Sequence, residues 1–339
     1  MTVGVRRVIG RVVTSLVVLA LVAGALVAYQ NRQLISDHFA AQSFTPTAEI
    51  VDLTARIRPT STGERIFFAS EPTLDASQSF NERCSQVDHT EEGHVLGCFS
   101  GGRIHLFKVT DERLAGIVEV TAAHELLHAA FSRLNDAGKA ELVQQLEAAF
   151  SELSATDPGL AERMVVYQGL SATAFANELH SVLGTEVRTL PAALETHYAQ
   201  WFEQRSVIVD YFDDYHTVFT ALKERASQLQ AELTTMRADI ELRSEIYDSA
   251  VAQFNSEWEI FLQRNEAFEF SDDPAEFYAI RNGFDTRRSI LNEDLARLNA
   301  DIATYEGLRV ELQQLGELST ELEANLNSEL APPATAPTA

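Results

Sequence analysis

The chain has 339 residues, of which 45% are hydrophobic and 22% charged, so it carries enough apolar material for a sizeable core and one to three domains. This composition excludes a wholly disordered chain. Its 50 acidic and 26 basic residues give a formal net charge of -24 at pH 7, which repels nucleic acid and excludes nucleic-acid binding as a function.

Residues 1–29 have the composition of a membrane anchor. An apolar run, VVTSLVVLALVAGALVA at 12–28, follows three arginines and no acid, and its length is at the short end of what crosses a bilayer as a helix. Because the arginines precede the run, we expect a single-pass cell-membrane protein with a cytoplasmic N-terminus and the rest of the chain outside. The alternative is a signal peptide cleaved near Ala23-Gly24-Ala25, which would make the protein secreted.

Residues 30–45 are expected to form a short tether that leads into a compact domain at 46–206. Apolar residues recur at helical spacing within 46–60 and predict a first small helix, which the sequence STGE ends in a turn.

Aromatic and β-branched residues then predict two or three strands of a small antiparallel sheet. The segments are RIFFAS at 65–70, HVLGCF at 94–99 and RIHLFKV at 103–109, with Gly101-Gly102 as the turn between the last two.

Cys84 and Cys98 are the two cysteines of the chain. In an exported protein, an isolated pair at this separation is expected to form a disulfide. The pair is a poor metal site, because no CxxC spacing accompanies it.

Beyond Leu114 the pattern is helical. We expect helices near 114–134, 137–154, 159–168 and 172–184, and Pro191 suits the first turn of another.

Residues 207–330 differ, because apolar residues recur there at alternating steps of three and four, as in a coiled coil. The sequence SDDP at 271–274 interrupts this pattern and predicts an antiparallel coiled-coil hairpin, a candidate surface for a protein partner or for self-association. Residues 331–339 are expected to be a disordered tail. The expected fold class is therefore α+β and mostly helical.

The motif HELLH at 124–128 carries the strongest chemical signal. On a helix, His124 and His128 lie one above the other, so both imidazoles can bind one metal ion. Glu125 lies about 100° round the helix, near enough to act as a general base on water that the metal activates. The flanking residues are uncharged and mostly apolar, which is typical of a helix buried beside a desolvated metal.

The segment TAAHELLHA resembles the active-site helix of the zincin metallopeptidases, and RIHLFKV before it resembles their substrate-binding strand. The metzincin continuation is absent, because Phe131 and Leu134 stand where its Gly and third His would fall. The resemblance is therefore to the gluzincins, whose third zinc ligand is a Glu on a later helix.

Within FANELHS at 175–181, Glu178 matches the gluzincin ligand, preceded by Asn177 as in that clan. His180 and Glu186 are alternative third ligands. The Asp that gluzincins carry one turn after this Glu is replaced here by Val182. Gluzincins also use a downstream His or Tyr to stabilise the oxyanion, and His197 and Tyr198 are the candidates, with a place at the edge of the core as the alternative.

The resemblance implies a membrane-anchored, extracytoplasmic zinc metallopeptidase that hydrolyses peptide bonds of a peptide or protein substrate. The alternative is an envelope scaffold in which the coiled-coil hairpin is the functional part and the zinc site is structural or inactive. A structural site is normally closed by four protein ligands, so an open fourth position would favour the enzyme.

Overall fold

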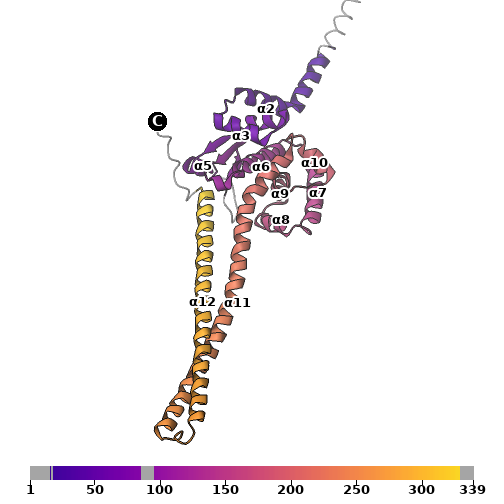
Figure 1. The fold of residues 1–339 in the computed structure, drawn as a ribbon. Helices are drawn as coiled ribbons and strands as arrows, with labels where there is room; N and C mark the ends of the chain where they lie inside the picture. Colours follow the sequence, from indigo (N-terminus) through magenta and orange to yellow (C-terminus); the bar gives the residue numbers. More distant parts are fainter. Residues whose placement is uncertain (1–15, 17, 85–94, 329–339) are drawn as a thin grey trace, which may run out of the picture. The chain divides into compact units, whose positions relative to one another are not determined.

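The computed structural model describes residues 16, 18–84 and 95–328, which are mostly helical with one three-stranded sheet (Figure 1). The chain divides into two compact units. Residues 1–218 with 322–339 form the first, here called the core unit, and residues 219–321 form the second, the hairpin unit. The expected tail at 331–339 and the first residues of the expected anchor lie outside the described residues.

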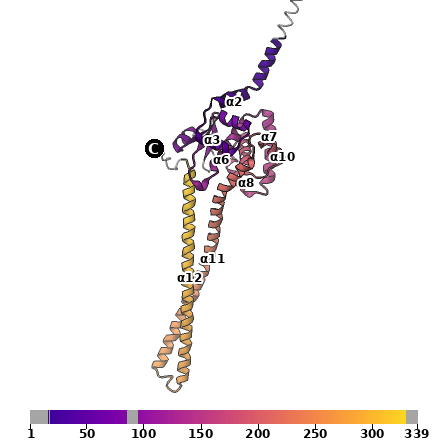
Figure 2. The same cartoon turned by 45° about the horizontal axis from the view of Figure 1, so that its top comes forward.

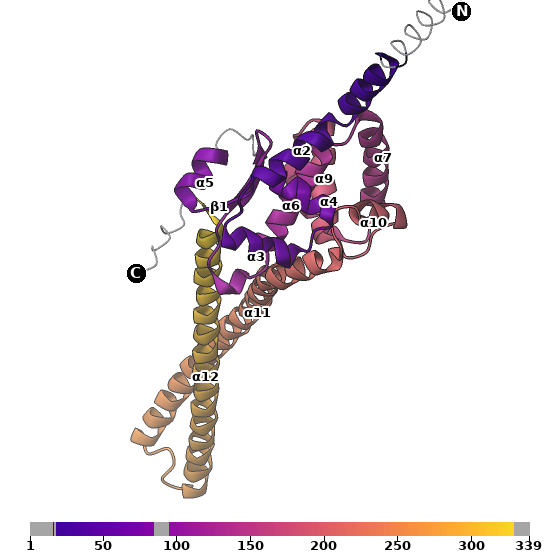
Figure 3. The ribbon, with the colours of Figure 1, turned by 90° about the horizontal axis from the view of Figure 1, so that it is seen from above.

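The segment expected to be a tether contains a helix, α2 (Arg32–Ser43), that packs against α4 (Ser61–Ala69) (Figure 3). The reason is a pairing that the sequence does not reveal. Asp37 of α2 is buried and accepts two hydrogen bonds from the guanidinium of Arg133, at 2.9 and 3.0 Å. A buried bidentate pair of this kind holds α2 in place.

A further helix, Val18–Gln30, precedes α2 and is bent from it by 66°. Among the described residues, no single helix is long and apolar enough to cross a membrane, although these two helices pass that test as a bent pair.

The first expected helix is confirmed as α3 (Ala48–Ile57), but the strand expected at RIFFAS is wrong, since these residues belong to α4. The sequence STGE, expected to be a turn, is the first turn of α4. Thr60 caps this helix, because its side chain accepts a hydrogen bond from the Gly63 N–H at 3.1 Å. The cap overrides the strand preference of the aromatic residues that follow.

The sheet is mixed and not antiparallel, with strand order β1-β3-β2. Strands β2 (Gly97–Ser100) and β3 (Arg103–Phe107) form the expected hairpin. Gly101 and Gly102 have φ values of 59° and 82°, as a two-residue hairpin turn requires. The parallel neighbour is β1 (Thr73–Asp75), whose three residues are too few for a sequence pattern.

The expected disulfide is confirmed, and Cys84 and Cys98 have an S–S distance of 2.02 Å. It joins the end of α5 (Ser77–Cys84) to β2, beside the packed rings of Phe80 and Phe107. The bridge contributes on the order of 3 kcal/mol by constraining the unfolded chain.

Helices make up the rest of the core unit, much as their periodicity predicts. The expected helix at 159–168 is divided into α8 (Pro158–Arg163) and a 3-10 turn, Val165–Tyr167. The other helices are α6 (Ile117–Ser132), α7 (Asp136–Leu153), α8 (Pro158–Arg163), α9 (Ala172–Glu186) and α10 (Ala192–Tyr198). The main hydrophobic core surrounds α6, which packs against α9 and against the sheet.

The hairpin unit consists of the adjoining parts of two long helices, α11 (Arg205–Glu266) and α12 (Pro274–Leu326), which lie side by side (Figure 2). For residues that pair between the two helices, the residue number increases along α11 while that of its partner decreases along α12. The pairs are Arg225–Glu311, Arg243–Asp301, Phe254–Phe284 and Phe261–Phe277. The two helices are therefore antiparallel, and an aromatic cluster fills the end near their connection.

Gly184 of α9 lets that helix approach α6, and we expect Gly184→Ala to lower the free energy of unfolding by about 1–3 kcal/mol. A Cβ there would lie 2.4 Å from Cδ1 of Leu127 and 2.6 Å from Cε1 of Tyr198. Gly138→Ala on α7 is the control, because its Cβ meets nothing closer than 3.4 Å. Urea denaturation measures both, and equal stabilities would contradict the close packing.

Candidate metal centre

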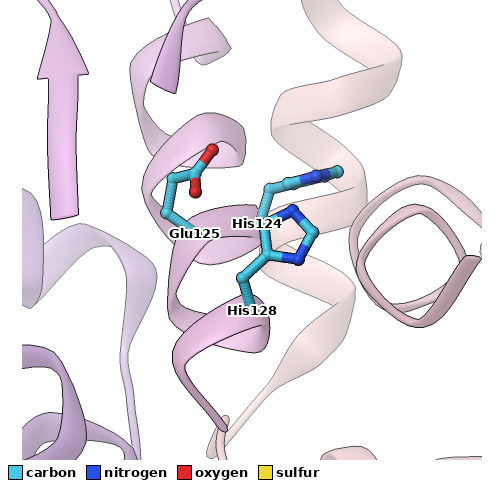
Figure 4. Close-up of side chains that lie close together, drawn as sticks. All are labelled: His124, Glu125 and His128. Carbon is cyan, nitrogen blue, oxygen red and sulfur yellow. The ribbon is translucent and has the colours of Figure 1, made fainter. Parts of the chain in front are cut away.

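Helix α6 places His124 and His128 on one side of the same helix. Figure 4 shows the two imidazoles next to each other, with the Glu125 carboxylate beside them on the same helix. The ring centroids are 4.7 Å apart. The expected i, i+4 geometry is thus present, and one nitrogen or oxygen of each of these three residues lies within 4.8 Å of the others. This group can hold a metal ion.

Helix α9 brings Glu178 to the same place. Its cap is Ser171, whose side chain accepts a hydrogen bond from the Ala174 N–H, and α9 then runs against α6. The Oε2 atom of Glu178 lies 3.4 Å from Nε2 of His124 and 3.4 Å from Nε2 of His128.

These distances fit a zinc ion. Tetrahedral ligands at the usual 2.0 to 2.1 Å from zinc are about 3.3 to 3.4 Å from one another, which matches both separations. Two imidazoles and a carboxylate are also a donor set that zinc accepts in catalytic sites. The side chains of His124, His128 and Glu178 keep exposed fractions of 16%, 10% and 18%, so solvent reaches them.

In the metal-free cluster, the imidazoles of His124 and His128 share the carboxylate of Glu178, and this arrangement sets the pKa values of all three. Burial lowers the pKa of His128, but the adjacent Glu178 carboxylate outweighs this effect and raises it to about 9. Burial lowers the pKa of His124, and the two imidazoles hold the pKa of Glu178 below its usual range despite burial. At neutral pH the cluster therefore holds one imidazolium beside a carboxylate.

Ser181 supports the site from behind, a role that the sequence analysis assigned to no residue. Its Oγ lies 3.2 Å from the backbone carbonyl of His124, to which it donates, and 3.3 Å from Nδ1 of His128. The hydroxyl oxygen then accepts from the Nδ1–H of His128, so Nε2 is the nitrogen left for a metal. Its position three residues after Glu178, on the same face of α9, is the signal that could have found it.

Glu125 lies against the sheet. A Cβ on Gly97 of β2 would lie 2.7 Å from Oε1 of Glu125 and 2.6 Å from Cγ2 of Thr121, so only glycine leaves room for this side chain. The residue Glu125 is 5% exposed. Its carboxylate lies next to the two imidazoles, and its charge also raises the pKa of His128.

The alternative third ligands have other partners. Glu186 forms an ion pair with Arg163, with Nε and Oε2 2.7 Å apart. His180 is fully buried and its Nε2 lies 2.9 Å from Nε2 of His197. Of the three candidates, Glu178 is the one that meets both histidines of the motif.

The two candidates for oxyanion stabilisation are bonded elsewhere. The hydroxyl of Tyr198 is buried and donates to the backbone carbonyl of His180 at 2.7 Å. The Nε2 atom of His197 accepts from Nε1 of Trp201 at 3.4 Å and contacts His180. Burial lowers the pKa of His197 to about 4, so this imidazole is neutral at pH 7.

Comparisons with protein-family models, curated proteins and solved structures gave no match to this chain. The interpretation of the site therefore depends on its geometry.

Zinc binding is expected to release close to one proton at pH 6.5, because zinc needs a neutral His128 whereas the metal-free residue is protonated below about pH 9. Glu178 does not contribute, because the imidazoles hold its pKa below the usual range, and burial lowers the pKa of His124 and so reduces the contribution of that residue. The zinc dissociation constant should then fall about tenfold for each pH unit gained below 9. Calorimetry in buffers of different ionisation enthalpy measures this, and an affinity independent of pH would contradict it.

Ser181→Ala is expected to weaken zinc binding by about 10- to 100-fold, because the imidazole of His128 loses the group that orients it. Competition with a chelating dye measures the affinity for the metal alone. Ser132→Ala is the matched control, since Ser132 of α6 donates only to the Ala129 carbonyl. Equal affinities for the two variants would remove Ser181 from the site.

Proposed function

We propose that this chain is a membrane-anchored, extracytoplasmic zinc metallopeptidase of gluzincin type. His124, His128 and Glu178 would hold the zinc, and Glu125 would be the general base. The observation that carries the proposal is the position of Glu178 Oε2, 3.4 Å from both imidazole Nε2 atoms of a helix that also presents Glu125.

Each residue has a distinct part in the hydrolysis of a peptide bond. Zinc, when bound, supplies Lewis-acid chemistry, lowering the pKa of water and polarising the scissile carbonyl. Glu125 accepts the proton that the attacking water loses and then delivers it to the leaving amine. Gly97 leaves the space that the Glu125 side chain occupies beside the strand, close to the cluster.

The count of ligands supports a catalytic site over a structural one. Three protein donors meet, and the described part of the chain has no free cysteine to add a fourth. His180 and Glu186 are held by His197 and Arg163. We therefore propose that a position for water and substrate stays open, whereas a structural zinc site is closed.

The proposed cellular location rests on the composition of the N-terminal segment and on the disulfide. Arginines before an apolar run favour insertion with the core unit outside the cytoplasm, and the disulfide agrees with an oxidising compartment.

A second candidate function, an envelope scaffold acting through the hairpin, is favoured by one observation. Phe268, between α11 and α12, has a φ of 62° and is 79% exposed. An aromatic residue in the left-handed region, presented to solvent, suits contact with a partner or with a second copy of the chain.

Glu125→Gln is expected to lower the rate of proteolysis by a factor on the order of 10² to 10⁴ while zinc binding persists, because only the base is lost. Fluorescein-labelled casein is a suitable unfolded probe, and metal analysis of the same sample reports the zinc.

Glu119→Gln is the matched control, since this glutamate lies on the same helix and pairs with Arg56 at 2.7 Å. It should retain activity. Unchanged proteolysis in Glu125→Gln would contradict the proposed peptidase activity and would favour the scaffold function.

A further inference from the structure

Helix α2 exposes a row of large apolar side chains. Leu34, Ile35 and Phe39 are 49%, 42% and 65% exposed. Residues two positions before and after Asp37 lie about 160° round the helix from it, so Ile35 and Phe39 are on the face opposite the buried pair with Arg133. The pair between Asp37 and Arg133 therefore buries one face of α2 and leaves the opposite face exposed.

These side chains line a groove of about 330 Å³ together with His38 and Arg65. Arg65 comes from α4, so the groove lies where α2 meets α4. Its walls are largely apolar, and its polar lining residues are His38 and Arg65, of which the guanidinium is a cation. The groove therefore suits a ligand with an apolar chain and an anionic group.

Arg65 has an unmet hydrogen-bonding requirement. Its Nε is buried and has no hydrogen-bond partner among the residues that the structure describes. A buried donor without an acceptor costs about 1–3 kcal/mol, and the cost is larger for a charged group. Arg65 lines the groove, and an anionic oxygen there would form a charge-assisted hydrogen bond with its guanidinium.

The neighbouring chain indicates where such a ligand comes from. Immediately before α2, the helix Val18–Gln30 exposes apolar side chains along its length. At the bend, the guanidinium of Arg32 stacks over the ring of Tyr29 at 4.6 Å, an arrangement typical of the membrane interface. The exposed face of α2 is therefore continuous with the segment that we propose to be the anchor.

We propose that the groove between α2 and α4 binds a phospholipid of the bilayer. Its acyl chain would lie along Leu34, Ile35 and Phe39, and its phosphate would accept hydrogen bonds from Arg65. The inference rests on the proposed membrane anchoring and adds a site that fixes the core unit against the bilayer. Because Arg133 also donates to the Ala129 carbonyl of α6, the lipid contact and the catalytic helix share one rigid connection.

This placement narrows the substrate class of the proposed peptidase. A core unit held by both the anchor and α2 has its metal centre at a limited distance from the membrane surface. The substrates that meet it are polypeptide segments close to the bilayer.

The test uses the full chain in phospholipid nanodiscs. Both native cysteines form the disulfide, so Phe39→Cys carries an environment-sensitive fluorophore as the single label. Phospholipid with a nitroxide on its acyl chain should quench this label several-fold more than the same label at Val51→Cys on α3, where the native side chain is 52% exposed.

Arg65→Gln in the Phe39→Cys background should reduce the quenching, and Arg65→Lys should restore part of it, since the phosphate needs a cation. Arg103→Gln is the control, because Arg103 already pairs with Glu71 at 2.8 Å. Thermal melting verifies that each variant is folded.

The outcomes separate the two proposals. Protein that floats with liposomes but shows equal quenching at positions 39 and 51, or quenching that Arg65→Gln leaves unchanged, overturns the lipid site and leaves the anchor standing. Protein that does not float overturns both. The effect of Glu125→Gln on proteolysis is independent of these results.

Discussion

The close packing of α6 against α9 is the contact on which the candidate metal centre depends. Gly184 lets the helices approach until Leu127 and Tyr198 fill the space that a side chain would take. Two residues of α9 then reach α6 on one face, since Glu178 meets the imidazole nitrogens and Ser181 meets the backbone and ring behind them. A helix crossing thus sets the ligand geometry, because the ligands come from rigid elements.

The same packing makes the centre a cation site before any metal enters it. The cluster is surrounded by apolar side chains, where an isolated carboxylate would be costly. A proton on His128 offsets the charge of Glu178, which is why the pKa of that imidazole is about 9. A metal ion would therefore compete with this proton for one position, and its occupancy would depend on pH.

The N-terminal part of the chain is connected to the site through one side chain. Arg133 follows α6 and binds Asp37 of α2, the Ala129 carbonyl and the hydroxyl of Ser70. The helix after the apolar segment is therefore part of the core unit. This connection gives the exposed face of α2 a defined orientation with respect to α6, which a flexible tether would not provide.

Several features of the protein could be predicted from the sequence because they depend on neighbours along the chain. The i, i+4 spacing alone places His124 and His128 together, and the single pair of cysteines predicts the disulfide that joins them. The Gly101-Gly102 turn and the long antiparallel helices are local in the same sense, since backbone conformation and side-chain period determine them.

Other features were decided by tertiary contacts. Three residues were candidates for the third ligand in the sequence, and only the packing of α9 on α6 shows that Glu178 lies beside the histidines. The core likewise buries Tyr198, whose hydroxyl donates to the His180 carbonyl. The segment 30–45, expected to be a tether, contains α2, which is held in place because Asp37 pairs with Arg133, almost a hundred residues later. A sequence records which donors are present, but their partners depend on which helices approach each other, and that is set by packing between residues distant in the chain.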